Sequence, residues 1–322
     1  MIVKERDFPI QIKKLEALQR RIPHFHPKMP DILNKLARRR SGYKGEESID
    51  YHLSFLDDKK YHILHTLRLR NNQNHHFQID TFIITSSFIA MIEVKSHKGT
   101  LIFDHQLQQL IQLYGDKKRA YEDPIIQVKR HKLQLREMLK HYKFPEIPIL
   151  PLITISNPST IVETIGHFKE YQWIIRSAKL VFEFQHFEQR YKKEILSKKE
   201  ITKLSKLLIK KHTPEEYDAL KNFNIDVSEI LTGVHCPRCF TMPMKRVTGN
   251  WVCAACSYTS KTAHLDTLRD YALLVNTTST KRDLQNFLQL DSRMVMSSII
   301  KSLHLPGSGE GKARRYQLEG IL

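Results

Sequence analysis

Residues 78–99 decide the fold of this chain, and they read QIDTFIITSSFIAMIEVKSHKG. Two runs rich in β-branched and aromatic side chains flank a short Thr-Ser-Ser turn at residues 85–87, so the stretch predicts an antiparallel hairpin. The second run, residues 88–92, is apolar without interruption, which predicts a strand that is buried on both faces.

This buried strand ends in charged residues. Glu93 and Lys95 are two positions apart, so their side chains lie on the same face of the strand. Asp80 lies at the far end of the partner strand, and the turn brings it back beside them. Two carboxylates and a lysine in such a place are costly unless they pair with each other or bind a cation.

The three residues alone allow two interpretations. In the first, Asp80 and Glu93 supply the hard oxygen ligands that Mg²⁺ or Mn²⁺ prefers, and Lys95 holds an attacking water or offsets charge on a phosphoryl group. In the second, Lys95 forms a structural ion pair with one of the carboxylates. Because Asp followed by Glu-x-Lys is a short and common pattern, the rest of the chain has to decide between them.

The composition points to a polyanionic partner. The chain has 322 residues, room for one large domain and one or two small ones, and a formal net charge of +18. Such an excess favours nucleic acid, DNA first and RNA as an alternative, over a membrane surface, because no basic amphipathic anchor or lipidation signal is present. The sequence does not predict an oligomeric state.

The chain is expected in the cytoplasm. No apolar run approaches the ~20 residues of a membrane span, and the charged N-terminus does not resemble a secretory signal. The four cysteines fall into two Cys-x-x-Cys pairs, a spacing typical of metal ligands in a reducing compartment rather than of disulfides.

Helices and strands are expected around the hairpin in a fixed order. Glu46 is expected in the first turn of a helix over residues 42–56, and Asp123 is expected to cap a later helix that begins with Pro124. Strands are expected at residues 61–69, 100–103, 107–113, 147–155, 174–175 and 179–184.

With these elements in order, the chain resembles the nuclease-related domain family, a branch of the PD-(D/E)xK nuclease superfamily, over roughly residues 38–160. The resemblance is carried by Gly42-x-x-Gly45-Glu46, Ile79-Asp80, Ile92-Glu93-Val94-Lys95-Ser96 with Gly99, and Asp123-Pro124-Ile125-x-Gln127. It implies an α/β fold of the restriction-endonuclease-like type, with a mixed central sheet flanked by helices.

The resemblance also implies roles for the hairpin residues. Asp80 and Glu93 look like the two metal carboxylates, and the Val94 carbonyl is in the position that completes their shell. Lys95 resembles the lysine that positions the water. Ile79 stands where the superfamily name has proline.

Two more residues are matched outside the hairpin. Glu46 is similar to the acid on the first helix, which binds a second metal or a water, and Gln127 matches the helix position that acts at the phosphate. The resemblance does not by itself establish catalysis, because binding-only members of such a fold exist.

The carboxy-terminal third carries a second metal motif. Cys236 and Cys239 form one pair, Cys253 and Cys256 form the other, and thirteen residues separate the pairs. Two such knuckles present four thiolates tetrahedrally, as structural Zn²⁺ requires, so the stretch is similar to a topoisomerase-type zinc ribbon. Four protein ligands leave no open position for catalysis at this metal.

The last sixty residues resemble a winged helix-turn-helix module. Arg293, Ser297 and Lys301 would face the major groove from the third helix, and Arg314 and Arg315 would meet the DNA backbone from the wing. A three-helix domain that docks another protein is the alternative.

Taken together, the sequence predicts a metal-dependent nuclease that hydrolyses phosphodiester bonds in DNA, with Mg²⁺ or Mn²⁺ for catalysis and Zn²⁺ for structure. The alternatives are a non-catalytic nucleic-acid-binding or regulatory protein with a degenerate nuclease fold and, more weakly, a protein-interaction adaptor. The predicted segments are a basic helical extension at 1–40, the nuclease-related core at 41–160, the rest of that core with a helical linker at 161–232, the zinc ribbon at 233–260 and the winged helix-like module at 261–322.

Overall fold

The computed structural model describes residues 1–71 and 73–322, with Lys312 described by its backbone alone. These residues form two compact units. The first unit contains Met1–Phe8 and Arg40–Glu215, and the second contains Pro9–Arg39 and Glu216–Leu322. The predicted segments 1–40 and 161–232 are therefore each divided between the two units.

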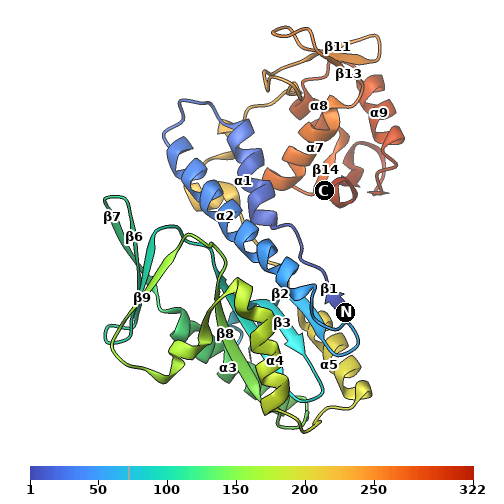
Figure 1. Ribbon diagram of the computed structural model, residues 1–322. Coiled ribbons are helices and arrows are strands. Elements are labelled where there is room, and N and C mark those ends of the chain that lie inside the picture. The colour runs from blue at the N-terminus through green and yellow to red at the C-terminus, as the bar shows by residue number, and fades with distance from the viewer. Residues whose placement is uncertain (72) are drawn as a thin grey trace. The chain divides into compact units, whose positions relative to one another are not determined.

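A six-stranded mixed sheet forms the centre of the first unit (Figure 1). Its order is β1-β2-β3-β4-β8-β10, with antiparallel pairing from β2 to β4 and parallel pairing at β1–β2, β4–β8 and β8–β10. The strands are β1 (Ile2–Lys4), β2 (His62–Arg70), β3 (His76–Ile84), β4 (Ile89–Lys95), β8 (Ile149–Ile155) and β10 (Ile174–Arg176). The predicted hairpin is the β3–β4 pair, and both of its strands have neighbours on either side.

Helices cover both faces of this sheet. The apolar side chains of α3 (Pro124–His141) and α5 (Lys198–Lys211) join one core with β2, β3 and β4. Those of α2 (Met29–Leu53) and α4 (Leu180–Arg190) join a second core on the other face. Side chains alternate between these cores along β4, with Met91 on the α3 face and Ile92 on the α2 face. The predicted α/β fold with a mixed central sheet flanked by helices is confirmed.

A smaller four-stranded sheet completes the first unit, in the order β7-β6-β5-β9. The bounds of its strands are β5 (Thr100–Asp104), β6 (Gln109–Tyr114), β7 (Lys117–Glu122) and β9 (Ile161–Ile165). Two 3-10 turns, η1 (Lys169–Trp173) and η2 (Ser177–Lys179), flank β10. The sequence did not predict β7 or β9, because β7 reads KKRAYE and carries no alternating apolar pattern.

Two predicted elements are wrong. The helix expected to begin at Gly42 begins at Met29 instead, because Pro30 lies in its first turn, where a missing N–H costs nothing. The strand expected at residues 179–184 is the beginning of helix α4, whose buried Leu180 and Phe184 are four residues apart. A short apolar run does not distinguish a strand from a helix.

The second unit combines helices with two small antiparallel sheets. One sheet has the order β11-β12-β13 and the other β14-β16-β15. The bounds of its elements are α1 (Ile10–Arg21), α6 (Ala219–Phe223), η3 (Val227–Glu229), β11 (Lys245–Val247), β12 (Asn250–Val252), β13 (Thr259–Ser260), α7 (Ala263–Leu274), β14 (Thr278–Thr280), α8 (Lys281–Leu288), α9 (Arg293–Ser302), β15 (Gly307–Ser308), η4 (Gly311–Ala313), β16 (Arg315–Gln317) and η5 (Glu319–Ile321).

Within the described part of the chain, every helix is too short or too polar to cross a membrane.

Candidate functional site

The open end of the β3–β4 hairpin holds the acidic residues. Asp80 is 8% exposed, and its Oδ2 accepts a hydrogen bond of 2.8 Å from the Val94 N–H. The carboxylate thus continues a ladder whose last backbone pair is Thr81 with Ile92. Asp80 and the end of β4 are brought together as predicted.

A local irregularity lies opposite Asp80. Thr66 on β2 has a φ of 49°, a left-handed conformation that β-branched residues rarely adopt. On β3, Phe77 and Ile79 reach the α3 core before Asp80, and Phe82 and Ile84 reach it after Asp80. The alternation of side chains between the two faces of the strand therefore shifts by one residue. Asp80 lies at the shift. Strain of this kind tends to gather at functional sites, where it sets the direction of a side chain.

Glu93 and Lys95 share a face of β4 and form an ion pair. The Lys95 Nζ lies 2.7 Å from the Glu93 Oε1 and also donates to the Gln127 Oε1 at 3.2 Å. Gln127 is in the first turns of α3, which begins as predicted. The Asp123 Oδ1 caps the helix by accepting from the Ile125 N–H at 2.8 Å.

Glu46 approaches the same site from α2. It lies in the interior of that helix rather than in a first turn, so the helix dipole does not explain its place. The preceding Gly45 allows the approach, because a Cβ there would lie 2.2 Å from the Ser96 Cβ and 2.9 Å from the Ser156 Oγ. The glycine is needed for close packing against the end of β4 and not for an unusual backbone.

Arg6 is a site residue that the sequence did not predict. Its side chain is 5% exposed, and its guanidinium forms ion pairs with Glu46 at 3.1 Å and Asp50 at 2.8 Å. It also donates to the backbone carbonyl of Asp80 at 3.4 Å and to the Thr81 Oγ1 at 3.2 Å. Arg6 therefore joins α2 to β3. Because forty residues separate it from Glu46, no local pattern could have indicated this role.

The site has an excess of negative charge. Burial raises the pKa of Asp80 well above its ordinary value, and the charges of Glu93 and Glu46 raise it further. Burial would lower the pKa of Lys95, but the charges of Glu93 and Asp80 outweigh it, so the lysine stays protonated. None of the described lysine, arginine or histidine side chains forms an ion pair with the Asp80 carboxylate. Two cations, Lys95 and Arg6, thus face the four carboxylates of Asp80, Glu93, Glu46 and Asp50.

This donor set fits a hard divalent cation. Asp80 and Glu93 offer carboxylate oxygens. The Val94 N–H faces β3, where it donates its hydrogen bond to Asp80. Because the N–H and C=O of one strand residue point to the same side, the Val94 carbonyl also faces β3. The three carboxylates are spaced more widely than a closed site requires. Among the described residues, only the four cysteines form a group of three or more acidic, histidine or cysteine ligand atoms that all lie within 4.8 Å.

His97 lies close to Lys95 and was also not predicted. Its ring packs edge-on against Tyr121, with the centroids 4.9 Å apart. Burial lowers the pKa of His97 and the charge of Lys95 lowers it further, so the ring is neutral. Its Nδ1 is buried and has no hydrogen-bond partner among the described protein atoms.

With this geometry established, comparison with known proteins identifies the domain. Residues 41–156 match the family model described as nuclease-related domain. The chain carries a nuclease-related domain. The match confirms the resemblance seen in the sequence. The matched residues include Glu46, the β3–β4 hairpin and helix α3.

A relative of this chain is known from Bacillus anthracis. It is described as an uncharacterized protein, and it is 21% identical over 139 residues, which are 43% of this chain and 64% of the relative. The matched stretch therefore spans less than two thirds of that relative.

The four cysteines of the second unit form a tight cluster. Cys236 and Cys256 have their sulfur atoms 3.7 Å apart, and Cys239 and Cys253 have theirs 3.5 Å apart, without any disulfide. Zn–S bonds of ≈ 2.3 Å in a tetrahedron place neighbouring sulfur atoms roughly 3.8 Å apart. The cluster therefore has the dimensions of a structural zinc site, as predicted for a zinc ribbon.

The last helices leave basic side chains exposed. Arg293, Ser297 and Lys301 lie on the exposed face of α9, whose buried face carries Met296, Ile299 and Ile300. Arg314 and Arg315 are exposed at the start of β16. The predicted contacts of these five residues with DNA remain predictions.

Proposed function

We propose that the chain is a metal-dependent nuclease that hydrolyses phosphodiester bonds in DNA. The observation that carries the proposal is the buried group of Asp80, Glu93 and Lys95 at the open end of the β3–β4 hairpin, in a nuclease-related domain. A structural ion pair needs one acid and one base, whereas here Lys95 and Arg6 pair with other carboxylates and Asp80 has no ion-pair partner among the described residues.

The residues divide the chemistry among them. Asp80, Glu93 and the Val94 carbonyl would hold Mg²⁺ or Mn²⁺, which when bound polarises the phosphate and lowers the pKa of a water. Lys95 would orient that water for attack on phosphorus, and the P–O bond opposite the water would break, leaving a phosphate monoester and a hydroxyl.

Two further side chains support this arrangement. Gln127 would fix the direction of the Lys95 Nζ through its hydrogen bond of 3.2 Å and lie beside the phosphate. Glu46 would bind a second cation or a water from the α2 side, held in place by Arg6.

The second unit would serve binding. Zn²⁺ held by the four cysteines would fold the ribbon, and the net charge of +18 would draw the chain to DNA. Helices α7, α8 and α9 with the β14-β16-β15 sheet would act as a winged helix, with Arg293, Ser297 and Lys301 toward the groove and the wing arginines toward the backbone. Four free thiol ligands fit a reducing compartment such as the cytoplasm.

A second candidate is a nucleic-acid-binding protein without activity. The ion pair of 2.7 Å between Lys95 and Glu93 favours it, because a lysine fully engaged by a carboxylate is also what a degenerate site would contain. In this case RNA would be as suitable a partner as DNA.

Cleavage assays separate the two candidates. Full-length protein is incubated with linear and supercoiled DNA and with RNA, with and without Mg²⁺ or Mn²⁺, beside Lys95→Ala and Asp80→Asn. Lys140→Ala, an exposed lysine of α3, is the matched control. We expect metal-dependent cleavage by wild type and Lys140→Ala and none by the site variants, which still bind DNA. Equal trace cleavage by all four proteins would refute the nuclease.

A further inference from the structure

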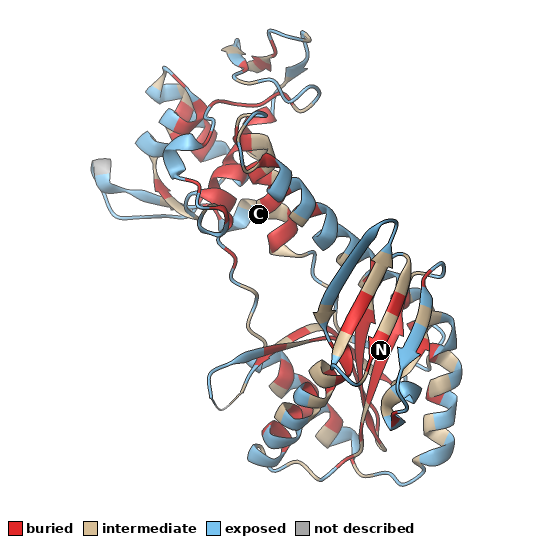
Figure 2. Cartoon of the chain, turned by 90° about the vertical axis from the view of Figure 1, so that its left-hand side faces the viewer, coloured by how far each residue is buried: buried red, intermediate tan, exposed pale blue. Residues whose placement is uncertain are grey.

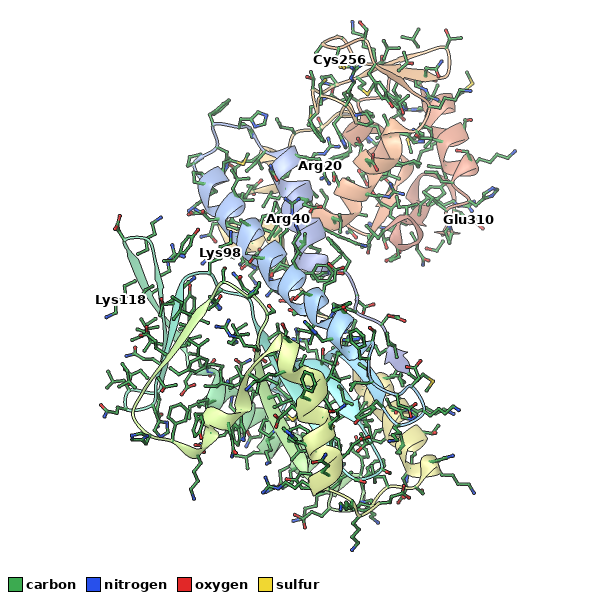
Figure 3. The ribbon with its side chains drawn as sticks, in the orientation of Figure 1. Arg20, Arg40, Lys98, Lys118, Cys256 and Glu310 are labelled. Carbon is green, nitrogen blue, oxygen red and sulfur yellow. The ribbon has the colours of Figure 1, made fainter. Side chains whose placement is uncertain are left out.

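The β6–β7 hairpin, residues 109–122, is a surface element of the first unit that the nuclease chemistry does not use. We call it the basic arm. Its strand β7 is exposed along almost its whole length (Figure 2). Lys117, Lys118 and Arg119 follow one another in this strand. Lys118 lies near the tip of the arm (Figure 3). The backbone pairing of β7 with β6 does not require three consecutive cationic side chains.

The arm is fixed to the segment that leaves the acidic site. Gly99 lies four residues after Lys95, and a Cβ there would lie 2.1 Å from the Leu113 carbonyl oxygen of the arm. The Gln112 side chain donates to the Lys98 carbonyl at 2.8 Å. Gly99, which has a φ of 83°, thus lets the segment after β4 pack closely against Leu113, toward the end of β6.

The other strand of the arm leads into the helix of the site. Tyr121 packs its ring on that of His97, and Glu122 forms an ion pair with Arg130 of α3 at 2.8 Å. The next residue, Asp123, caps α3, whose first turns carry Gln127. Both strands of the arm are therefore anchored within a few residues of the acidic site.

One face of the arm is continuous with the face of the small sheet that packs against α3. Directly opposite residues of an antiparallel pair share a face, and the register pairs Leu110 with Tyr121, Gln112 with Arg119 and Tyr114 with Lys117. Leu110 and Tyr121 belong to the core between this sheet and α3. We call this side of the arm the inner face, and Lys118 lies on the opposite face.

The inner face changes from apolar to cationic toward the tip. From Tyr121 to Lys117 the strand spans about 13 Å, at ≈ 3.3 Å per residue. Along this length it offers Gln112, Arg119, Tyr114 and Lys117, of which the last three are exposed. Guanidinium, ammonium, amide and phenol groups in a row are the donors that contact phosphate and sugar in nucleic-acid complexes.

We propose that the inner face of the basic arm binds the phosphate backbone of the DNA substrate beside the acidic site. The proposal rests on the proposed function in one respect, namely that nucleic acid is the ligand. The arm would hold the DNA strand near the end of β4 and the start of α3. Arg119 and Lys117 would each contact a phosphate, and Lys118 would contact none.

The salt dependence of binding tests the inner face. Affinity of the full-length protein for a short fluorescent duplex is measured by anisotropy at several salt concentrations, with neither added Mg²⁺ nor chelator, so that the ribbon keeps its zinc. Each lost phosphate contact lowers the slope of log K against log salt by about 0.9 for duplex DNA. We expect that decrease for Arg119→Ala, about twice that decrease for Lys117→Ala/Arg119→Ala, and an unchanged slope for Lys118→Ala.

Lys118→Ala is a matched control, because it removes an equal charge from the neighbouring exposed residue of the same strand. Equal slopes for Arg119→Ala and Lys118→Ala, whether both fall or neither does, would overturn the proposal. The outcome is independent of cleavage. Wild type that never cuts DNA but shows the difference between the two variants would refute the nuclease and retain the arm, and wild type that cuts without the difference would refute the arm alone.

Discussion

Two buried aspartates of this protein have opposite surroundings. Asp270 in the second unit is fully buried and accepts three hydrogen bonds from Arg20 and Arg21, at 2.6, 2.8 and 3.4 Å. Asp80 in the first unit accepts one from a backbone N–H, and burial with the charges of Glu93 and Glu46 raises its pKa more than the charge of Lys95 lowers it. The first carboxylate forms ion pairs with two guanidiniums, whereas the second has no ion-pair partner among the described residues.

The guanidinium networks of the two units sharpen this contrast. Arg21 lies between Asp270, His235 and Thr267, with donor distances of 2.8, 2.8 and 2.9 Å. Arg6 has a similar set of partners in the first unit, including His65 at 2.8 Å and Thr81 at 3.2 Å. Both histidines are neutral, because burial and the adjacent arginine lower the pKa of each to about 4. The same device stabilises both units, but only Arg6 holds its carboxylates beside further acids.

We expect the largest loss of stability from breaking the buried ion pair between Asp270 and Arg21. Asp270→Asn leaves the buried Arg21 without its counter-charge, which costs about 3–5 kcal/mol. Hydrogen exchange measured by mass spectrometry in increasing urea, on peptides of α7, reports the free energy of unfolding of the second unit. Asp266→Asn on the same helix is the control, since its pair with Arg269 is half exposed and costs about 0.5 kcal/mol. Equal losses for the two variants would contradict the assignment of Asp270 as a buried pair.

Removing Arg6 is expected to have the next largest effect. Arg6→Ala leaves Glu46 and Asp50 without their cation and should destabilise the first unit by about 3 kcal/mol. The loss is read from peptides of β3 and α2 by the same exchange experiment. Adding Glu46→Gln to Arg6→Ala should recover part of the stability, because one stranded charge is removed. If the effects of the two substitutions on the free energy of unfolding were simply additive, Arg6 would not act through Glu46.

The packing of α2 beside the acidic site gives a smaller effect. Gly45→Ala forces a methyl group against Ser96 and should cost about 1–3 kcal/mol. Gly42→Ala, one turn earlier in open space, should instead stabilise the helix by up to about 1 kcal/mol. Thermal denaturation of both variants measures the difference. Opposite signs support the close approach of α2 to the end of β4, and equal signs would exclude it.

The smallest effect is expected at Asp80 itself. Asp80→Asn keeps an oxygen that can accept from the Val94 N–H but removes a charge disfavoured by burial and by two other carboxylates. Without added divalent metal the variant should be more stable than wild type by about 1 kcal/mol, as is common when an active-site charge is removed. Destabilisation would show that the carboxylate is a structural element like Asp270.

Much of the site could be predicted from the sequence, because its signals are local. The β3–β4 hairpin, the Asp123 cap with Pro124 and the two cysteine pairs are each encoded within a few residues. The structure brings Asp80, Glu93, Lys95, Glu46 and Gln127 to one end of the sheet, while their catalytic roles remain predictions. The family resemblance, and with it the mixed sheet between helices, is confirmed.

The features that were missed depend on contacts between distant segments. Arg6 meets Asp50 across forty-four residues, and Thr66 takes its left-handed conformation opposite Asp80 for reasons that only the assembled sheet shows. The helix α2 passes through two glycines because one of them packs against Ser96. Strand β7 has a polar sequence and is held by its pairing with β6, so no hydrophobic period reveals it.

The central claim is that Asp80 and Glu93 form a cation site, and calorimetric titration with Mn²⁺ tests it most directly. Zinc-loaded full-length protein is used, and Mn²⁺ does not displace zinc from thiolates because it binds such ligands more weakly. We predict that Mn²⁺ binds wild type and that this binding is lost in Asp80→Asn but kept in Asp266→Asn. Equal binding by wild type and Asp80→Asn, or no binding by wild type, would contradict the account.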